Sequence, residues 1–187
     1  PYGASGPARS WPERRLGVTI AVYPGTFDPM HYGHIDIVRR AARIFDALIV
    51  GVYDRPHKSV LFAGDERVAM ARQALADLPN VQVMLYRSLT VDFAHQQGAS
   101  VIVRGLRVIS DFELEYQMAL TNRSLSPDID TLCLMTSLDH AFISSSIVKE
   151  LAESGACVDR LVPEHVLRAL EQRFQARRQD SVAGTQC

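Results

Sequence analysis

Apolar residues recur along the chain in two alternating patterns, one typical of strands and the other typical of helices. Short runs rich in apolar and β-branched residues predict strands at 18–23, 47–53, 81–85, 100–103 and 131–135. Between and after these runs, apolar residues spaced three or four positions apart predict helices at 33–45, 65–78, 91–97, 110–125, 144–154 and 163–174. Strands that alternate with helices in this way predict an α/β fold, in which helices cover both faces of a parallel sheet.

The pattern favours a doubly wound, Rossmann-like topology for the five-stranded sheet, because crossover connections are right-handed. The two ends of the chain lack the pattern: residues 1–16 are rich in Pro, Gly, Ser and Arg, and residues 175–187 show no clear apolar spacing. We therefore expect a flexible N-terminal extension at 1–16, a single domain at 17–174 and a flexible C-terminal tail at 175–187.

Composition and charge exclude several classes of protein. With 47% hydrophobic and 22% charged residues, the chain is typical of a globular domain and not of a disordered one. Lys and Arg number 20 and Asp and Glu number 21, so the net charge is -1 and no general basic field is available for nucleic acid. No signal peptide is evident and no apolar run reaches the ~20 residues of a membrane span, so we expect no membrane partner.

The cysteines indicate a reducing compartment. Cys133, Cys157 and Cys187 are an odd number and form no C-x-x-C pair. This argues against a disulfide framework and against a zinc finger, and it favours a cytoplasmic location. We expect Cys133 to be buried as a small apolar residue.

The loop after the first predicted strand carries the first candidate chemistry. It reads P-G-T-F-D-P-M-H-Y-G-H over residues 24–34 and ends where a helix begins. A helix N-terminus favours phosphate, Gly33 allows a ligand to approach the backbone closely, and His34 can donate a hydrogen bond to a phosphoryl oxygen. Two other interpretations stay open: a helix cap with surface histidines, or zinc bound by His31 and His34, for which no third ligand is evident.

Three later loops add positive charge at the same edge of the sheet. Lys58 follows the second strand, and Arg104 and Arg107 follow the fourth, where they suit phosphate oxygens. A serine triplet at 144–146 opens a helix whose capping-box positions hold no acid, so its N-terminus is left open for an outside anion and Lys149 adds charge. Each of these features alone could be an ordinary surface residue or helix cap.

Together these loops describe a polyphosphate site at the carboxyl edge of the sheet. The chain has neither G-x-x-x-x-G-K-[ST] nor G-x-G-x-x-G, which argues against a P-loop enzyme and a dinucleotide-binding dehydrogenase. No side chain is placed as an obvious covalent nucleophile. The predicted chemistry is therefore electrostatic stabilisation of phosphoryl or nucleotidyl transfer.

Several of these motifs are shared with a known family. The segments YPGTFDP with H-x-G-H, VIVRGLR and FISSSIVKE closely resemble bacterial phosphopantetheine adenylyltransferases, members of the nucleotidyltransferase superfamily, and the resemblance covers about residues 18–174. It implies that a nucleotidyltransferase domain transfers AMP from ATP to 4'-phosphopantetheine by direct in-line attack. The products would be dephospho-coenzyme A and pyrophosphate, in the penultimate step of coenzyme A biosynthesis. The resemblance also implies Mg²⁺ bound with ATP, a homohexamer and feedback inhibition by coenzyme A.

The resemblance assigns roles to individual residues. His34 would stabilise charge on the transferring phosphate, and Thr26 would position the attacking phosphate. Lys58 and Arg104 would hold the phosphate of 4'-phosphopantetheine, and Thr90 falls where its arm is bound. The residues implied to contact ATP are Thr26, Phe27, His34, Gly105, Leu106, Arg107, Glu115, His140, Ala141, Phe142, Ile143, Ser144, Ser145 and Ser146. From its own surroundings in the sequence, Glu115 reads only as an exposed acid on a helix.

Two positions depart from the family pattern. Position 31 is commonly threonine in the family and position 140 is often Trp or Tyr, whereas both are histidine here.

Three other functions are alternatives to this one. The first is an adenylyltransferase for a pyridine mononucleotide, although such enzymes tend to end with I-S-S-T-x-x-R and this chain has I-S-S-S-x-x-K. The others are a nucleotide-binding regulator, against which the presence of His34, Lys58 and Arg104 argues, and a flavodoxin-like electron carrier.

Overall fold

The computed structural model describes residues 18–56 and 59–183. The expected extension at 1–16 lies outside the described residues, and so does Lys58. The strands are β1 (Ile20–Gly25), β2 (Ala47–Tyr53), β3 (Val81–Tyr86), β4 (Val101–Leu106) and β5 (Asp130–Met135). The helices are α1 (Tyr32–Ala41), α2 (Gly64–Ala74), α3 (Thr90–Gln96), α4 (Ile109–Leu125), the 3-10 turn η1 (Leu138–His140), α5 (Ser145–Ser154) and α6 (Glu164–Ala183).

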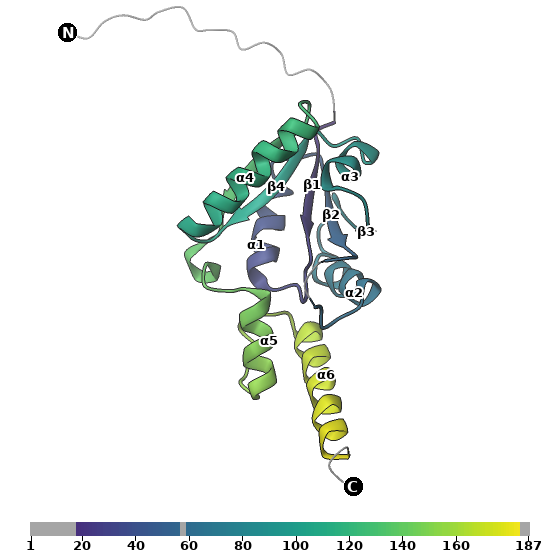
Figure 1. Ribbon diagram of the computed structural model, residues 1–187, viewed down its shortest axis with the longest axis vertical. Helices are drawn as coiled ribbons and strands as arrows, with labels where there is room; N and C mark the ends of the chain where they lie inside the picture. The colour runs from purple at the N-terminus through teal and green to yellow at the C-terminus, as the bar shows by residue number, and fades with distance from the viewer. Residues whose placement is uncertain (1–17, 57–58, 184–187) are drawn as a thin grey trace, which may run out of the picture.

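The strands form one parallel sheet in the order β3-β2-β1-β4-β5, which confirms the predicted doubly wound topology. The order reverses between β1 and β4, and a reversal of this kind leaves a crevice at the carboxyl ends of the strands. The ladder between β1 and β4 is short, with Ala21 opposite Val101 and Val22 opposite Ile102, whereas β1 pairs with β2 along its whole length from Ile20 to Gly25. The strands point towards the end of the molecule where α5 and α6 lie (Figure 1).

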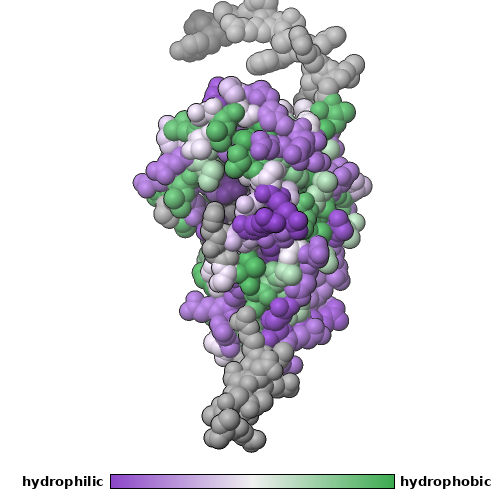
Figure 2. All heavy atoms as spheres, turned by 45° about the vertical axis from the view of Figure 1, so that its right-hand side comes forward, coloured by the Kyte–Doolittle hydropathy of each residue, from purple (hydrophilic) through white to green (hydrophobic). Residues whose placement is uncertain are grey.

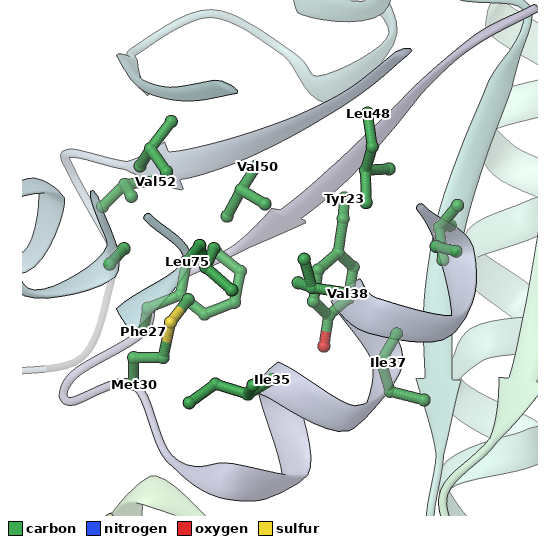
Figure 3. Close-up of a cluster of buried hydrophobic side chains, with 14 of the residues drawn as sticks. Tyr23, Phe27, Met30, Ile35, Ile37, Val38, Leu48, Val50, Val52 and Leu75 are labelled. Atoms are coloured by element: carbon green, nitrogen blue, oxygen red, sulfur yellow. The ribbon is translucent and has the colours of Figure 1, made fainter. Parts of the chain in front are cut away.

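The two faces of the sheet are buried by different helices. On one face, Tyr23 of β1 and Leu48, Val50 and Val52 of β2 pack against α1 and α2, with Val38 at the centre of the contact (Figure 3). On the other face, Val22, Ile49 and Ile102 pack against Phe93 of α3. Side chains alternate between the faces along a strand, so a nearly continuous apolar run is what a sheet buried on both sides requires.

A third cluster joins the C-terminal helices to the segment before α2. Val148 of α5 and Leu170 of α6 are fully buried, and they pack with Leu61 and Phe62. Helix α6 continues to Ala183, beyond the predicted end at 174, because no glycine or proline interrupts the helix-forming residues before Gly184. Most of the expected tail is therefore helical.

The far edge of the sheet is less completely covered. Of the six residues of β5, Asp130, Cys133 and Met135 are exposed. The expectation that Cys133 is buried was wrong, because an edge strand presents part of its surface to solvent. Over the side shown in Figure 2, hydrophilic and hydrophobic side chains are interspersed. No described helix is both long enough and apolar enough to cross a membrane.

Candidate active site

A cavity of about 570 Å³ opens at the carboxyl ends of β1 and β4, at the reversal of strand order. The predicted site residues that line it are Thr26, Phe27, His34, Thr90, Arg104, Gly105, Arg107, Ser144, Ser145 and Ser146. Leu106, Glu115, His140, Ala141, Phe142 and Ile143 do not belong to this lining. Four loops that are far apart in the sequence therefore meet around one space of the size of a small-molecule site.

The first loop is closed by two histidines that cap each other. His31 precedes α1, and its Nδ1 accepts from the backbone N–H of His34 at 3.4 Å, while the Nδ1 of His34 accepts from the backbone N–H of His31 at 3.3 Å. Their rings stack with centroids 3.6 Å apart. Because Nδ1 of His34 acts as an acceptor, the neutral imidazole carries its hydrogen on Nε2. Burial lowers the pKa of His31 to about 3, so this ring stays neutral at physiological pH.

Phe27 also contacts the ring of His34. Its ring meets that of His34 edge-on, with centroids 4.9 Å apart, and it meets Tyr23 in the same way at 5.5 Å. Phe27 has a positive φ of 49°, which is uncommon for a residue with a side chain. A Cβ on Gly25 would lie 2.7 Å from the Phe27 ring, so glycine is needed at that position. Burial raises the pKa of Tyr23 to about 12, so its hydroxyl stays protonated at the floor of the cavity.

Arg104 is held by a carboxylate. Its Nε and one terminal nitrogen each donate to Glu115 at 2.6 Å, and the other terminal nitrogen donates to the Pro24 carbonyl at 3.1 Å. Burial alone would lower the pKa of Arg104, but the bonds and charge of Glu115 outweigh burial and raise it. The side chain of Glu115 is 15% exposed, so the reading of it as an exposed helix acid was wrong.

Arg107 connects the loop after β4 to the loop before α5. Its backbone N–H and its Nε donate to Asp111 at 3.1 and 3.0 Å, and another guanidinium nitrogen donates to the Ile143 carbonyl at 3.3 Å. Burial raises the pKa of Asp111, but the hydrogen bonds from Arg107 outweigh burial and leave it below its usual value. The guanidinium is thereby oriented at the mouth of the cavity.

The start of α5 differs from the expectation. Ser144 caps the helix by accepting from the backbone N–H of Ile147 at 3.2 Å, and Ser145 donates to the Pro29 carbonyl at 2.9 Å. Lys149 was expected to add positive charge to the anion site. Instead its Nζ forms a 2.7 Å ion pair with Asp28, because that carboxylate is buried directly beside it.

Between β5 and α5, residues 138–143 lie outside the cavity lining, whereas Thr136 and Ser144 belong to it. His140 ends η1, and its Nδ1 is hydrogen-bonded to the Ser137 hydroxyl at 2.8 Å. Its ring lies 6.4 Å from that of Tyr32, centroid to centroid. Phe142 is 62% exposed, whereas Ile143 is buried.

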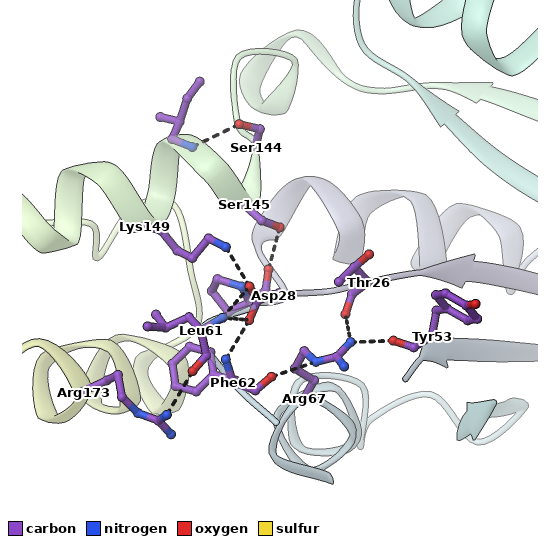
Figure 4. Close-up of polar contacts among 12 residues, drawn as sticks. Thr26, Asp28, Tyr53, Leu61, Phe62, Arg67, Ser144, Ser145, Lys149 and Arg173 are labelled. Carbon is purple, nitrogen blue, oxygen red and sulfur yellow. Dashed lines mark hydrogen bonds and ion pairs between the residues drawn. The ribbon is translucent and has the colours of Figure 1, made fainter. Parts of the chain in front are cut away.

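Two polar residues that hold the site together were missed. Arg67 of α2 is fully buried, and its guanidinium donates to the carbonyls of Thr26 at 2.6 Å, Tyr53 at 2.8 Å and Phe62 at 3.0 Å (Figure 4). No spacing rule separates Arg67 from an ordinary surface arginine on a helix. Asp28 stands within the T-F-D-P motif, but the sequence offered no partner for it.

Comparisons with known proteins show which family this sequence resembles. Residues 22–151 match the family model described as cytidylyltransferase-like. A protein of Thermomicrobium roseum named phosphopantetheine adenylyltransferase is 52% identical over 158 residues, which cover 83% of this chain and 95% of the relative. Proteins of the same name from Roseiflexus sp. and Synechococcus sp. are 51% and 50% identical, over 86% and 83% of this chain and 100% and 98% of their own lengths.

Proposed function

The chain belongs to the phosphopantetheine adenylyltransferase family, and from that premise we propose that it transfers the adenylyl group of ATP to 4'-phosphopantetheine. The products are dephospho-coenzyme A and pyrophosphate, in the penultimate step of coenzyme A biosynthesis. The observation that carries the proposal is the cavity at the reversal of strand order. There the first loop, the loop after β4 and the N-terminus of α5 meet around a single space.

His34 acts on the transferring phosphate in this proposal. Its Nδ1 is committed to the backbone N–H of His31, so the neutral ring offers the Nε2 hydrogen as a donor. As negative charge builds up on the α-phosphate during in-line attack, a preorganised donor stabilises the transition state more than the ground state. Thr26, one residue before Phe27, lies in the same wall of the cavity and positions the attacking phosphate.

Arg104 and Lys58 bind the phosphate of 4'-phosphopantetheine, and Thr90 contacts its arm. Glu115 and Pro24 use three of the five N–H donors of the Arg104 guanidinium. The group can therefore remain paired with Glu115 and still donate to a phosphate oxygen. On the nucleotide side, Arg107 and the Ser144–146 start of α5 contact ATP, since both line the cavity.

Mg²⁺ enters this scheme with the nucleotide. The described part of the chain holds no group of three or more His, Cys, Asp or Glu side chains that could form a metal site. Mg²⁺ is commonly bound through substrate phosphates and retained waters, so the triphosphate itself would supply its main ligands. The ion would neutralise charge on the triphosphate, while the arginines of this chain hold the phosphates in place.

The proposal includes self-association into a homohexamer, as in the family. The surface of α4 supports it. Ile109, Phe112, Tyr116 and Leu120 follow helical spacing, so they share one side of α4, and each is more than half exposed. Such a patch is typical of a protein interface. Multi-angle light scattering should show a hexamer for the wild type and smaller species for Leu120→Glu. We also extend feedback inhibition by coenzyme A and a cytoplasmic location to this protein.

The test is pyrophosphate release with Mg²⁺, ATP and 4'-phosphopantetheine. Parallel reactions contain nicotinamide mononucleotide or no acceptor. Release that depends on 4'-phosphopantetheine, with dephospho-coenzyme A detected by mass, is the expected result. Release with nicotinamide mononucleotide alone would contradict the proposed substrate. ATP binding without release would indicate a nucleotide-binding regulator.

A further inference from the structure

A buried ion pair connects the first loop of the site to the helix that follows the serine triplet. Lys149 lies in the second turn of α5, and its Nζ is 2.7 Å from Oδ2 of Asp28, which is 121 residues earlier in the chain. Asp28 is 1% exposed, and the side chain of Lys149 is 23% exposed. Because the two charges neutralise each other, Lys149 is poorly suited to serve as the counter-charge of a bound phosphate.

Asp28 is a rigid attachment point for this lysine. Its carboxylate accepts from the backbone N–H of Leu61 at 2.9 Å and from that of Phe62 at 3.0 Å (Figure 4). The segment that donates these bonds is itself held by α6, since Arg173 donates to the Leu61 carbonyl at 2.9 Å. Lys149 therefore binds a carboxylate whose position is set by two other parts of the fold.

Helix α5 has two polar attachments to the first loop in addition to its apolar contacts. It packs mainly against α6, and both helices lie beyond the carboxyl ends of the strands (Figure 1). The Lys149–Asp28 pair and the bond from Ser145 to the Pro29 carbonyl lie one helical turn apart on α5. Both reach the same short segment of the first loop, so together they fix the distance between the start of α5 and that loop.

We propose that Lys149 is a positioning residue, which through Asp28 holds the N-terminus of α5 where it meets the β- and γ-phosphates of ATP. This inference rests on the proposed function. The N–H groups at the start of a helix favour an anion only within the first turn, so a small displacement of α5 removes the contact. Lys149 thereby acts on the phosphates that leave as pyrophosphate without touching them.

The test compares ATP with AMP, which lacks the β- and γ-phosphates. For Lys149→Met, titration calorimetry without 4'-phosphopantetheine should show the Kd of Mg²⁺–ATP raised about tenfold and the Kd of AMP changed by less than about twofold. Arg168→Met is the matched control, because it removes an exposed ion pair to Glu164 on α6 and should change neither Kd. Asp28→Asn tests the same contact from the other side and should show the same selective loss for ATP.

The outcomes separate the inference from the proposed function. The positioning role is wrong if either variant folds and binds both nucleotides with the Kd values of the wild type. It is also wrong if the Kd values of ATP and AMP rise by the same factor. A lower melting temperature with an unchanged ratio of ATP to AMP affinity would also overturn it, since the pair would then only stabilise the fold. A wild-type protein that binds neither nucleotide would instead overturn the proposed function.

Discussion

Arg67 offers a quantitative test of how the site is held together. Its guanidinium is fully buried, and within the described residues its hydrogen bonds all go to backbone carbonyls and none to a carboxylate. Its bonds join the end of β1, the end of β2 and the segment before α2. Burial lowers the pKa of Arg67, and the nearby charges of Asp28 and Asp54 oppose that shift.

The magnitude follows from three short bonds and one buried charge. The bonds to Thr26, Tyr53 and Phe62 measure 2.6, 2.8 and 3.0 Å, and at a net value of about 1.5–3 kcal/mol for each bond from a charged donor they contribute at most about 4.5–9 kcal/mol. Burying the guanidinium costs several kcal/mol in return. Arg67→Met removes both effects, so we expect the free energy of unfolding to fall by about 2–4 kcal/mol.

Arg67→Lys gives the sharper comparison. An ammonium group retains the cost of a buried charge but cannot reach all three carbonyls, so this variant should lose at least as much free energy of unfolding as Arg67→Met. Urea unfolding followed by far-UV circular dichroism at one protein concentration measures both losses. Arg39→Met, which removes an exposed pair with Asp77, should change the free energy by less than about 1 kcal/mol. A lysine variant as stable as the wild type would refute the reasoning.

Three further variants test the cavity. His31 has its pKa lowered to about 3 by burial, so the unfolded chain binds more protons between that pH and about 6.5, and stability falls as pH falls through this window. Between pH 7 and pH 5 the free energy of unfolding of His31→Thr, measured with urea, should therefore fall by about 2 kcal/mol less than that of the wild type. An equal fall in both proteins would contradict this. His34→Ala should lower kcat about 10²–10³-fold with little change in ATP affinity. Equal losses in kcat and ATP affinity would mean that His34 binds the ground state as strongly as the transition state. Arg104→Lys cannot hold Glu115 and Pro24 together, so kcat/KM for 4'-phosphopantetheine should fall about tenfold or more in steady-state kinetics; an unchanged value would argue against the role of Arg104.

The sheet could be predicted from the sequence because its signal is local. The run at Ala47–Tyr53 is apolar at nearly every position, and the strand has these bounds in the structure. The helix predicted over 163–174 was too short, because the regular apolar spacing ends at Phe174 whereas residues of high helical propensity continue to Ala183. Apolar spacing reports burial, and a helix can extend beyond the part of it that is buried.

The partners of the charged residues could not be predicted in the same way. Lys149 looked like part of the anion site, and the 121-residue separation from Asp28 left no local sign of their pairing. Glu115 is only eleven positions from Arg104, yet the contact depends on how α4 lies against β4, which the sequence does not state. Long-range polar contacts depend on tertiary packing, so motif reading finds the residues of a site more readily than their orientation.

The short ladder between β1 and β4 has a mechanical consequence. Beyond Val22 and Ile102 no further pair joins these strands in register, although both continue towards the cavity. The backbone ladder between β3-β2-β1 and β4-β5 is therefore confined to the amino-terminal part of the two inner strands, and nearer the cavity a side chain takes its place, since Arg104 of β4 donates to the Pro24 carbonyl of β1. The cavity is lined by residues from both sides of this short ladder, among them Thr26 after β1 and Gly105 of β4, so a ligand bound there would span the two parts of the sheet.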